Sequence, residues 1–140
     1  MKTIKDPHFK KLHETSEFVV GNVFEYAYLI NKKNHKEIYM GGFCAGDPSC
    51  GLIEENNNWC VVGGEILNVW SSDNGLLSIE DEDLNWVVDI RQKSSNEVEL
   101  LIDPWSDKGS VWELNIKTLE RHKIRDYLMA NEEYTDEFDW

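Results

Sequence analysis

Short runs of β-branched and aromatic residues, separated by polar turn-forming residues, recur along most of this chain. In residues 23–30 the large aromatic and aliphatic side chains fall largely on alternate positions, as on one face of a strand. A polar turn at 31–36 leads to a return strand at 37–40. This spacing predicts a mainly β fold, built as an antiparallel meander, a sandwich or a small barrel with one or two short helices.

The same alternation continues through the rest of the chain, with turn signals such as Ser71-Ser72-Asp73-Asn74-Gly75 between the runs. We therefore expect further short strands, several of them paired as hairpins. The expected strands cover residues 50–54, 59–62, 66–70, 86–91, 97–102 and 112–116.

The two ends of the chain carry weaker patterns. We expect one domain over residues 1–140, a length that can bury a core without metal or disulfide support. Residues 1–16 are polar and basic and are expected to form a helical or flexible arm. Residues 125–133 are expected to form a short helix, and residues 134–140 a mobile acidic tail.

The charge of the chain restricts its partners. The net charge is −13, and residues 1–36 contribute +3 while residues 37–140 contribute −16. A strongly negative surface repels nucleic acid and anionic membranes and attracts basic proteins and cations. The acidity therefore predicts no nucleic-acid or membrane partner, and it fits either a basic protein partner or solubility alone.

No run approaches the roughly 18 apolar residues of a membrane span, and no signal peptide is visible at the first residues. Three cysteines, an odd number, disfavour a secreted disulfide framework. We therefore expect a cytoplasmic protein, with no prediction of its oligomeric state.

No catalytic or metal-binding motif stands out. Cys44, Cys50 and Cys60 lack the close spacing of a zinc site, so we expect reduced, unliganded thiols and no metal or cofactor. Asp89 and Asp103 lie within hydrophobic strands, where one could serve as an acid or base, but outward-facing positions on a sheet explain them more simply. We assign no catalytic residue.

Acidic side chains are the best contact candidates. Glu80, Asp81, Glu82 and Asp83 form a compact block of like charge. Such a block is either a solvated turn or a surface that binds a basic partner. The tail beyond residue 131, in which acids alternate with aromatic residues, is the alternative contact surface.

One stretch resembles a known class of proteins. The segments GDPSCGLI (46–53), NWCVVGGE (58–65) and VW (69–70) are similar to a pattern in small bacterial immunity proteins of polymorphic toxin and contact-dependent growth inhibition systems. The resemblance implies a small acidic protein that binds and neutralises a cognate toxin domain, many of which are basic nucleases. The resemblance implies no residue roles. Beside the acidic block, we take the segment 64–70, with Glu65 and Trp70, as the other contact candidate.

Two other classes of function stay open. A small enzyme that uses carboxylates in a β cleft would show converging acids and a perturbed pKa. A structural or regulatory interaction module, such as a set of propeller-like hairpins, would show exposed sheet edges or a contact patch.

Overall fold

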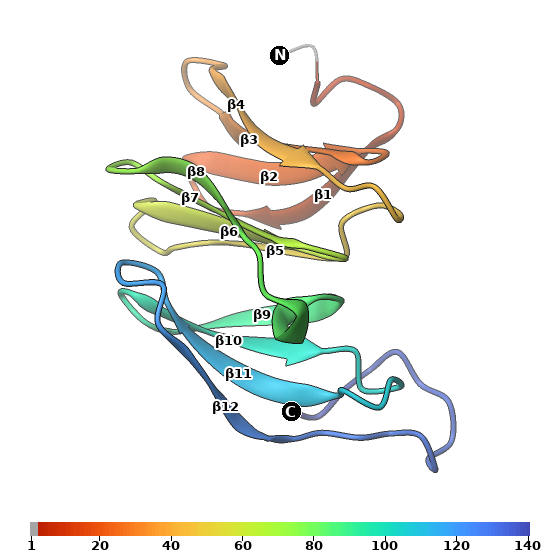
Figure 1. Cartoon of the computed structure of the whole chain (residues 1–140). Coiled ribbons are helices and arrows are strands. Elements are labelled where there is room, and N and C mark those ends of the chain that lie inside the picture. Colours follow the sequence, from red (N-terminus) through yellow and green to blue (C-terminus); the bar gives the residue numbers. More distant parts are fainter. Residues whose placement is uncertain (1–2) are drawn as a thin grey trace.

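The computed structural model describes residues 3–140, which form twelve strands and one short 3₁₀ helix. The strands make three antiparallel sheets of four, and in each sheet the strands follow the order of the chain (Figure 1). The described strands do not close into a barrel. The prediction of a mainly β antiparallel fold is confirmed, and the arrangement is a series of meanders.

We call the three sheets A, B and C. Sheet A contains β1 (Phe9–Glu14), β2 (Phe18–Val23), β3 (Tyr26–Asn31) and β4 (Glu37–Gly42). Sheet B contains β5 (Cys50–Ile53), β6 (Trp59–Gly63), β7 (Leu67–Ser71) and β8 (Gly75–Ile79). The 3₁₀ helix η1 (Glu82–Leu84) precedes sheet C, which contains β9 (Val87–Ser94), β10 (Glu97–Ile102), β11 (Ser110–Asn115) and β12 (Arg121–Asp126).

The sheets stack as three layers, with sheet B in the middle (Figure 1). The first strands of the sheets are neighbours, because β5 contacts both β1 and β9. Strand β6 shows why sheet B takes the central position. All its residues are buried, and its apolar run suits a strand that is covered on both faces.

Two hydrophobic layers result from this stacking. Trp59 and Val61 of β6 point into the layer between sheets B and C, where they join Leu84 and Leu100 among others. Cys60 and Val62 point the other way, into the layer between sheets A and B. A one-residue shift of β6 would exchange the two sets, so the alternation fixes its register.

The ends of the chain differ in part from the sequence-based expectations. Within the described residues of the expected arm, Phe9–Glu14 is strand β1 paired with β2, so a helix there is wrong; residues 1–2 lie outside the described part. The expected helix at 125–133 is also wrong, because β12 extends to Asp126 and residues 127–140 contain no helix. In β1, pairing with β2 overrides local helical preference, whereas the backbone N–H groups of Tyr127 and Met129 bond to the loop between β10 and β11.

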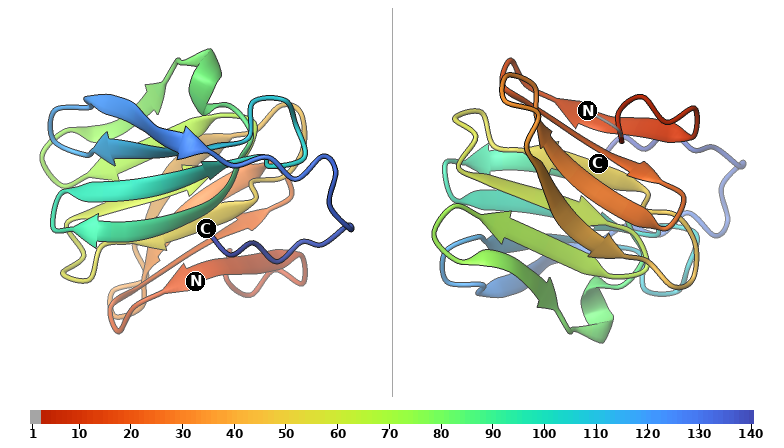
Figure 2. Two further views of the ribbon diagram at one scale, coloured as in Figure 1. Left: turned by 90° about the horizontal axis from the view of Figure 1, so that it is seen from below. Right: turned by 90° about the horizontal axis from the view of Figure 1, so that it is seen from above.

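Residues 134–140, expected to be a mobile acidic tail, fold back beneath sheet C (Figure 2). The indole N–H of Trp140 donates a hydrogen bond to Asp89 of β9 at 2.9 Å. Among residues 3–140 we find no helix with the length and apolar character needed to cross a membrane.

Candidate docking surface

The acidic block follows β8 and is held in place by Leu84, the residue after it, and by the cap of helix η1. Leu84, 1% exposed, is buried in the layer between sheets B and C and anchors helix η1. The carboxylate of Asp81 accepts a hydrogen bond from the backbone N–H of Asp83 at 3.0 Å, which caps the helix. Glu80, Glu82 and Asp83 remain exposed to solvent. We call residues 80–83 the acidic ridge.

Asp81 differs from the other acids of the ridge. Its carboxylate also forms an ion pair with Arg121 of β12, at 3.5 Å. Asp81 therefore has two internal partners, and its carboxylate is partly neutralised within the protein. The charges available to a partner are those of Glu80, Glu82 and Asp83.

A hollow lies on each side of the acidic ridge, and Glu82 and Asn85 line both. The first hollow, about 530 Å³, is also lined by Ile66, Ser78, Ile79, Glu80 and Asp81. The second, about 330 Å³, is also lined by Trp86, Ile102, Ser106, Asp107 and Lys108. The ridge thus adjoins two recesses that could receive side chains of a partner.

Trp86 supplies the aromatic component of this surface. It is 49% exposed and has a left-handed backbone conformation, with φ of 62°. Its backbone N–H donates to the carbonyl of Glu65 at 3.3 Å, and the next N–H, from Val87, donates to Gly64 at 2.9 Å. These bonds bring Glu65, a sequence-predicted contact, next to the ridge.

Trp70, the other predicted contact, lies elsewhere. It is half-buried on β7, opposite Cys60 and Leu76 of the flanking strands, and packs against the layer between sheets A and B. The structure therefore groups Glu65 with residues 80–83 and leaves Trp70 out.

Sequence reasoning missed Trp86 as a contact residue, because it read that tryptophan as the start of a strand. The available signal was its position two residues after Leu84, the apolar residue that ends the acidic run. Its exposure depends on a left-handed backbone conformation, which is uncommon for a residue other than glycine.

The acids considered for catalysis have structural partners. Asp89 is exposed and accepts the hydrogen bond from Trp140. Asp103 accepts a hydrogen bond from the backbone N–H of Trp105 at 3.0 Å and so stabilises the turn after β10. Asp89 thus has the exposed strand position that the sequence suggested, whereas Asp103, expected within a strand, lies just after β10.

The cysteines are spread across different environments. Cys44 is exposed, Cys50 is partly buried and Cys60 is buried, and all three are free thiols. Burial raises the pKa of the Cys50 and Cys60 thiols above the usual range. In the described part of the chain no three His, Cys, Asp or Glu side chains gather as a metal site.

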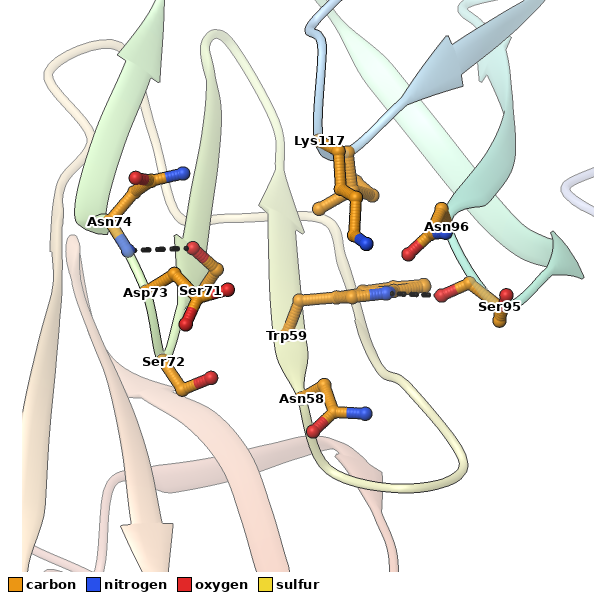
Figure 3. A pocket seen from close by; sticks show the side chains of 10 residues that line it. Asn58, Trp59, Ser71, Ser72, Asp73, Asn74, Ser95, Asn96 and Lys117 are labelled. Carbon is orange, nitrogen blue, oxygen red and sulfur yellow. Dashed lines mark hydrogen bonds between the residues drawn. The ribbon is translucent and has the colours of Figure 1, made fainter.

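Another hollow, polar and of about 440 Å³, lies where turns of sheets B and C meet (Figure 3). Trp59 forms one wall, and its indole N–H is used in a 2.8 Å hydrogen bond to the carbonyl of Ser95. Polar side chains also line the hollow, including those of Asp73, Asn96 and Lys117. The hollow is suited to water or a small polar molecule.

No protein-family model matches this sequence, and comparison with curated proteins finds no significant match.

Proposed function

We propose that this chain binds and neutralises a basic protein, such as a nuclease-like toxin domain, in the cytoplasm through the acidic ridge. The observation that carries the proposal is the exposure of Glu80, Glu82 and Asp83 between two hollows, beside a half-exposed Trp86. The net charge of −13 adds a long-range field of the same sign.

The ridge and Trp86 have different roles in this proposal. Exposed carboxylates accelerate encounter with a basic partner, because opposite charges steer diffusion. A partly exposed tryptophan supplies contact area that is lost to water on binding, which slows dissociation. The two hollows offer space for arginine or lysine side chains of the partner beside Glu82, which lines both.

The first test uses the protein encoded by the adjacent upstream gene, produced together with this chain. We expect this chain to restore growth of cells that make the adjacent protein, and the purified pair to associate. The association rate should fall as salt rises, since at physiological ionic strength charges are screened beyond about 8 Å. A partner that is acidic, or whose association is independent of salt, contradicts the proposal.

Variants then locate the contact. The triple variant Glu80→Gln, Glu82→Gln and Asp83→Asn should slow association, and Trp86→Ala should speed dissociation. The matched control removes three charges from the tail, by changing Glu132, Glu133 and Glu137 to Gln. If the tail variant loses binding and the ridge variant keeps it, the ridge is the wrong surface.

A second candidate, an interaction module, is favoured by the outer face of sheet A. Tyr26 and Tyr39 are 45% and 50% exposed, and Tyr28 lies between β2 and β4 on the same face. The ring centroids of Tyr26 and Tyr28 lie 6.4 Å and 5.9 Å from that of Tyr39. A partner that is lost on Tyr39→Ala but kept in the ridge variant would favour this second function.

A further inference from the structure

The chain after β12 follows a defined path along the loop between β10 and β11. The backbone N–H of Tyr127 donates to Gly109 at 2.9 Å, and that of Met129 donates to Pro104 at 2.8 Å. Further on, the ring of Tyr134 stacks on Trp105 with centroids 5.3 Å apart. The segment then returns toward β9 (Figure 2).

Four residues form one row across the outer face of sheet C. Strand register places Asp89 opposite Leu101, Leu101 opposite Val111, and Val111 opposite Arg125. This row faces away from sheet B, because Leu100 and its alternate neighbours on β10 fill the core. Leu101 and Val111 are nevertheless 0% exposed, so something covers them.

Trp140 contacts both ends of this row. Its indole N–H donates to Asp89 at 2.9 Å, and its backbone oxygen accepts a hydrogen bond from Arg125 at 2.6 Å. Trp140 therefore bridges the two ends of the row, on the face of sheet C that Leu101 and Val111 share.

Arg91 completes the surroundings of Trp140. Its guanidinium carbon lies 3.9 Å from the centroid of the indole ring and it donates to the backbone oxygen of Trp140 at 2.9 Å. Arg91 is also held by Glu99, at 2.9 Å. The guanidinium groups of Arg91 and Arg125 thus donate to one oxygen, and the carboxylate of Asp89 accepts the indole N–H. This arrangement recognises a tryptophan through both its ring and its main chain.

We propose that the outer face of sheet C is a recognition site for tryptophan, which Trp140 of the same chain occupies as a releasable latch. The ligand class is an indole with a neighbouring carbonyl or carboxylate oxygen. Release would expose Leu101 and Val111 and leave Arg91 and Arg125 without their shared oxygen. This proposal is independent of the acidic ridge and of any toxin.

The segment that leads to Trp140 is attached by uncharged groups. Its polar contacts before Trp140 use aromatic side chains and backbone groups, such as the 3.2 Å bond from the Trp105 indole N–H to the carbonyl of Thr135. Its acids at positions 136, 137 and 139 are exposed to solvent. Because the segment is tethered, its high local concentration keeps the site filled even when each contact is weak.

The test follows the methyl NMR signals of Leu101 and Val111 in the full chain. An indole ring above these methyl groups should shift their signals upfield in the unmodified protein. Trp140→Ala should abolish that shift, and Tyr134→Ala, which removes only the ring stacked on Trp105, should preserve it. Adding N-acetyl-L-tryptophan to Trp140→Ala should restore the shift in a saturable way, and N-acetyl-L-phenylalanine, which has no indole N–H, should bind more weakly.

Arg125→Gln placed in the Trp140→Ala chain should weaken binding of N-acetyl-L-tryptophan by about tenfold, the cost of one charge-assisted hydrogen bond. Three results would overturn the proposal. The first is an absence of upfield shifts in the unmodified chain, and the second is no response of Trp140→Ala to the probe. The third is loss of the shifts on dilution, which would mean that the tryptophan comes from a second copy.

Discussion

The Nδ1 atom of His13 accepts a hydrogen bond from the backbone N–H of Ile53 at 3.0 Å, which links β1 of sheet A to β5 of sheet B. Only a histidine with a free lone pair on Nδ1 can accept this bond. Burial lowers the pKa of His13 below its ordinary value of 6.5. The contact between the two sheets therefore depends on the neutral imidazole.

The first prediction follows from this contact. The unfolded chain takes up a proton at His13 before the folded chain does, so the free energy of unfolding should decrease as pH falls below about 6.5. The free energy of unfolding should stop decreasing once the pH is below the pKa of His13 in the folded protein. His13→Asn keeps an acceptor but does not titrate, so its denaturation curves at pH 7 and pH 5 should differ less. The control is His35→Asn in the exposed turn after β3, which should retain the full pH dependence.

The second prediction concerns thiol reactivity. Cys44 is exposed, whereas Cys60 is buried and the Cys50 sulfur lies 3.7 Å from the carbonyl oxygen of Val87. Since thiolates are the reactive species and burial raises the pKa of the latter two thiols, native protein should label rapidly at one site only. Mass spectrometry should show three labels on the denatured protein. The native Cys44→Ser variant should not be labelled rapidly. Rapid labelling at Cys50 would mean that sheets B and C separate readily.

The third prediction separates structural from exposed acids on the ridge. Asp81→Ala removes both the cap of η1 and the ion pair with Arg121, so it should lower the free energy of unfolding by about 1–2 kcal/mol. Glu80→Gln and Glu82→Gln, at exposed positions, should change it by less than about 0.5 kcal/mol. Urea denaturation measures all three. Equal effects would show that the cap contributes nothing.

The fourth prediction concerns the close approach of the final segment to Gly109. A Cβ at this position would overlap the carbonyl oxygen of Tyr127 and lie 2.8 Å from the Cα of Pro104. Gly109→Ala should therefore cost about 1–3 kcal/mol, as overpacking does, and make the segment beyond residue 127 more sensitive to protease. The neighbouring exposed substitution Lys108→Ala should leave both properties unchanged.

Some of this architecture could be read directly from local patterns. The apolar run at 59–62 predicted a strand where the structure has β6, and the polar turns between apolar runs placed most hairpins correctly. These features depend on residues close together in the chain. Strand β1 was missed because its exposed residues are polar, and only pairing with β2 makes it a strand.

The surfaces were harder to predict because they depend on how distant elements meet. Glu65 lies beside the ridge only because Trp86 bonds to its carbonyl, and Trp70 is directed into the layer between sheets A and B by the register of β7. The row from Asp89 to Arg125 is set by strand pairings that include shifts of register next to Leu101 and Val111. A local alternation pattern contains no information on such shifts.

Each sheet is made from one uninterrupted stretch of chain, so its hydrogen bonds close only short loops. During synthesis, sheet A can be complete before the residues of sheet B have left the ribosome. The layer between sheets A and B can then form before that between B and C, and Trp140, which follows all three sheets in the chain, docks on a sheet that is already assembled. The sheets can therefore assemble in the order in which they are translated. No strand needs a partner strand from a later sheet to complete its own sheet.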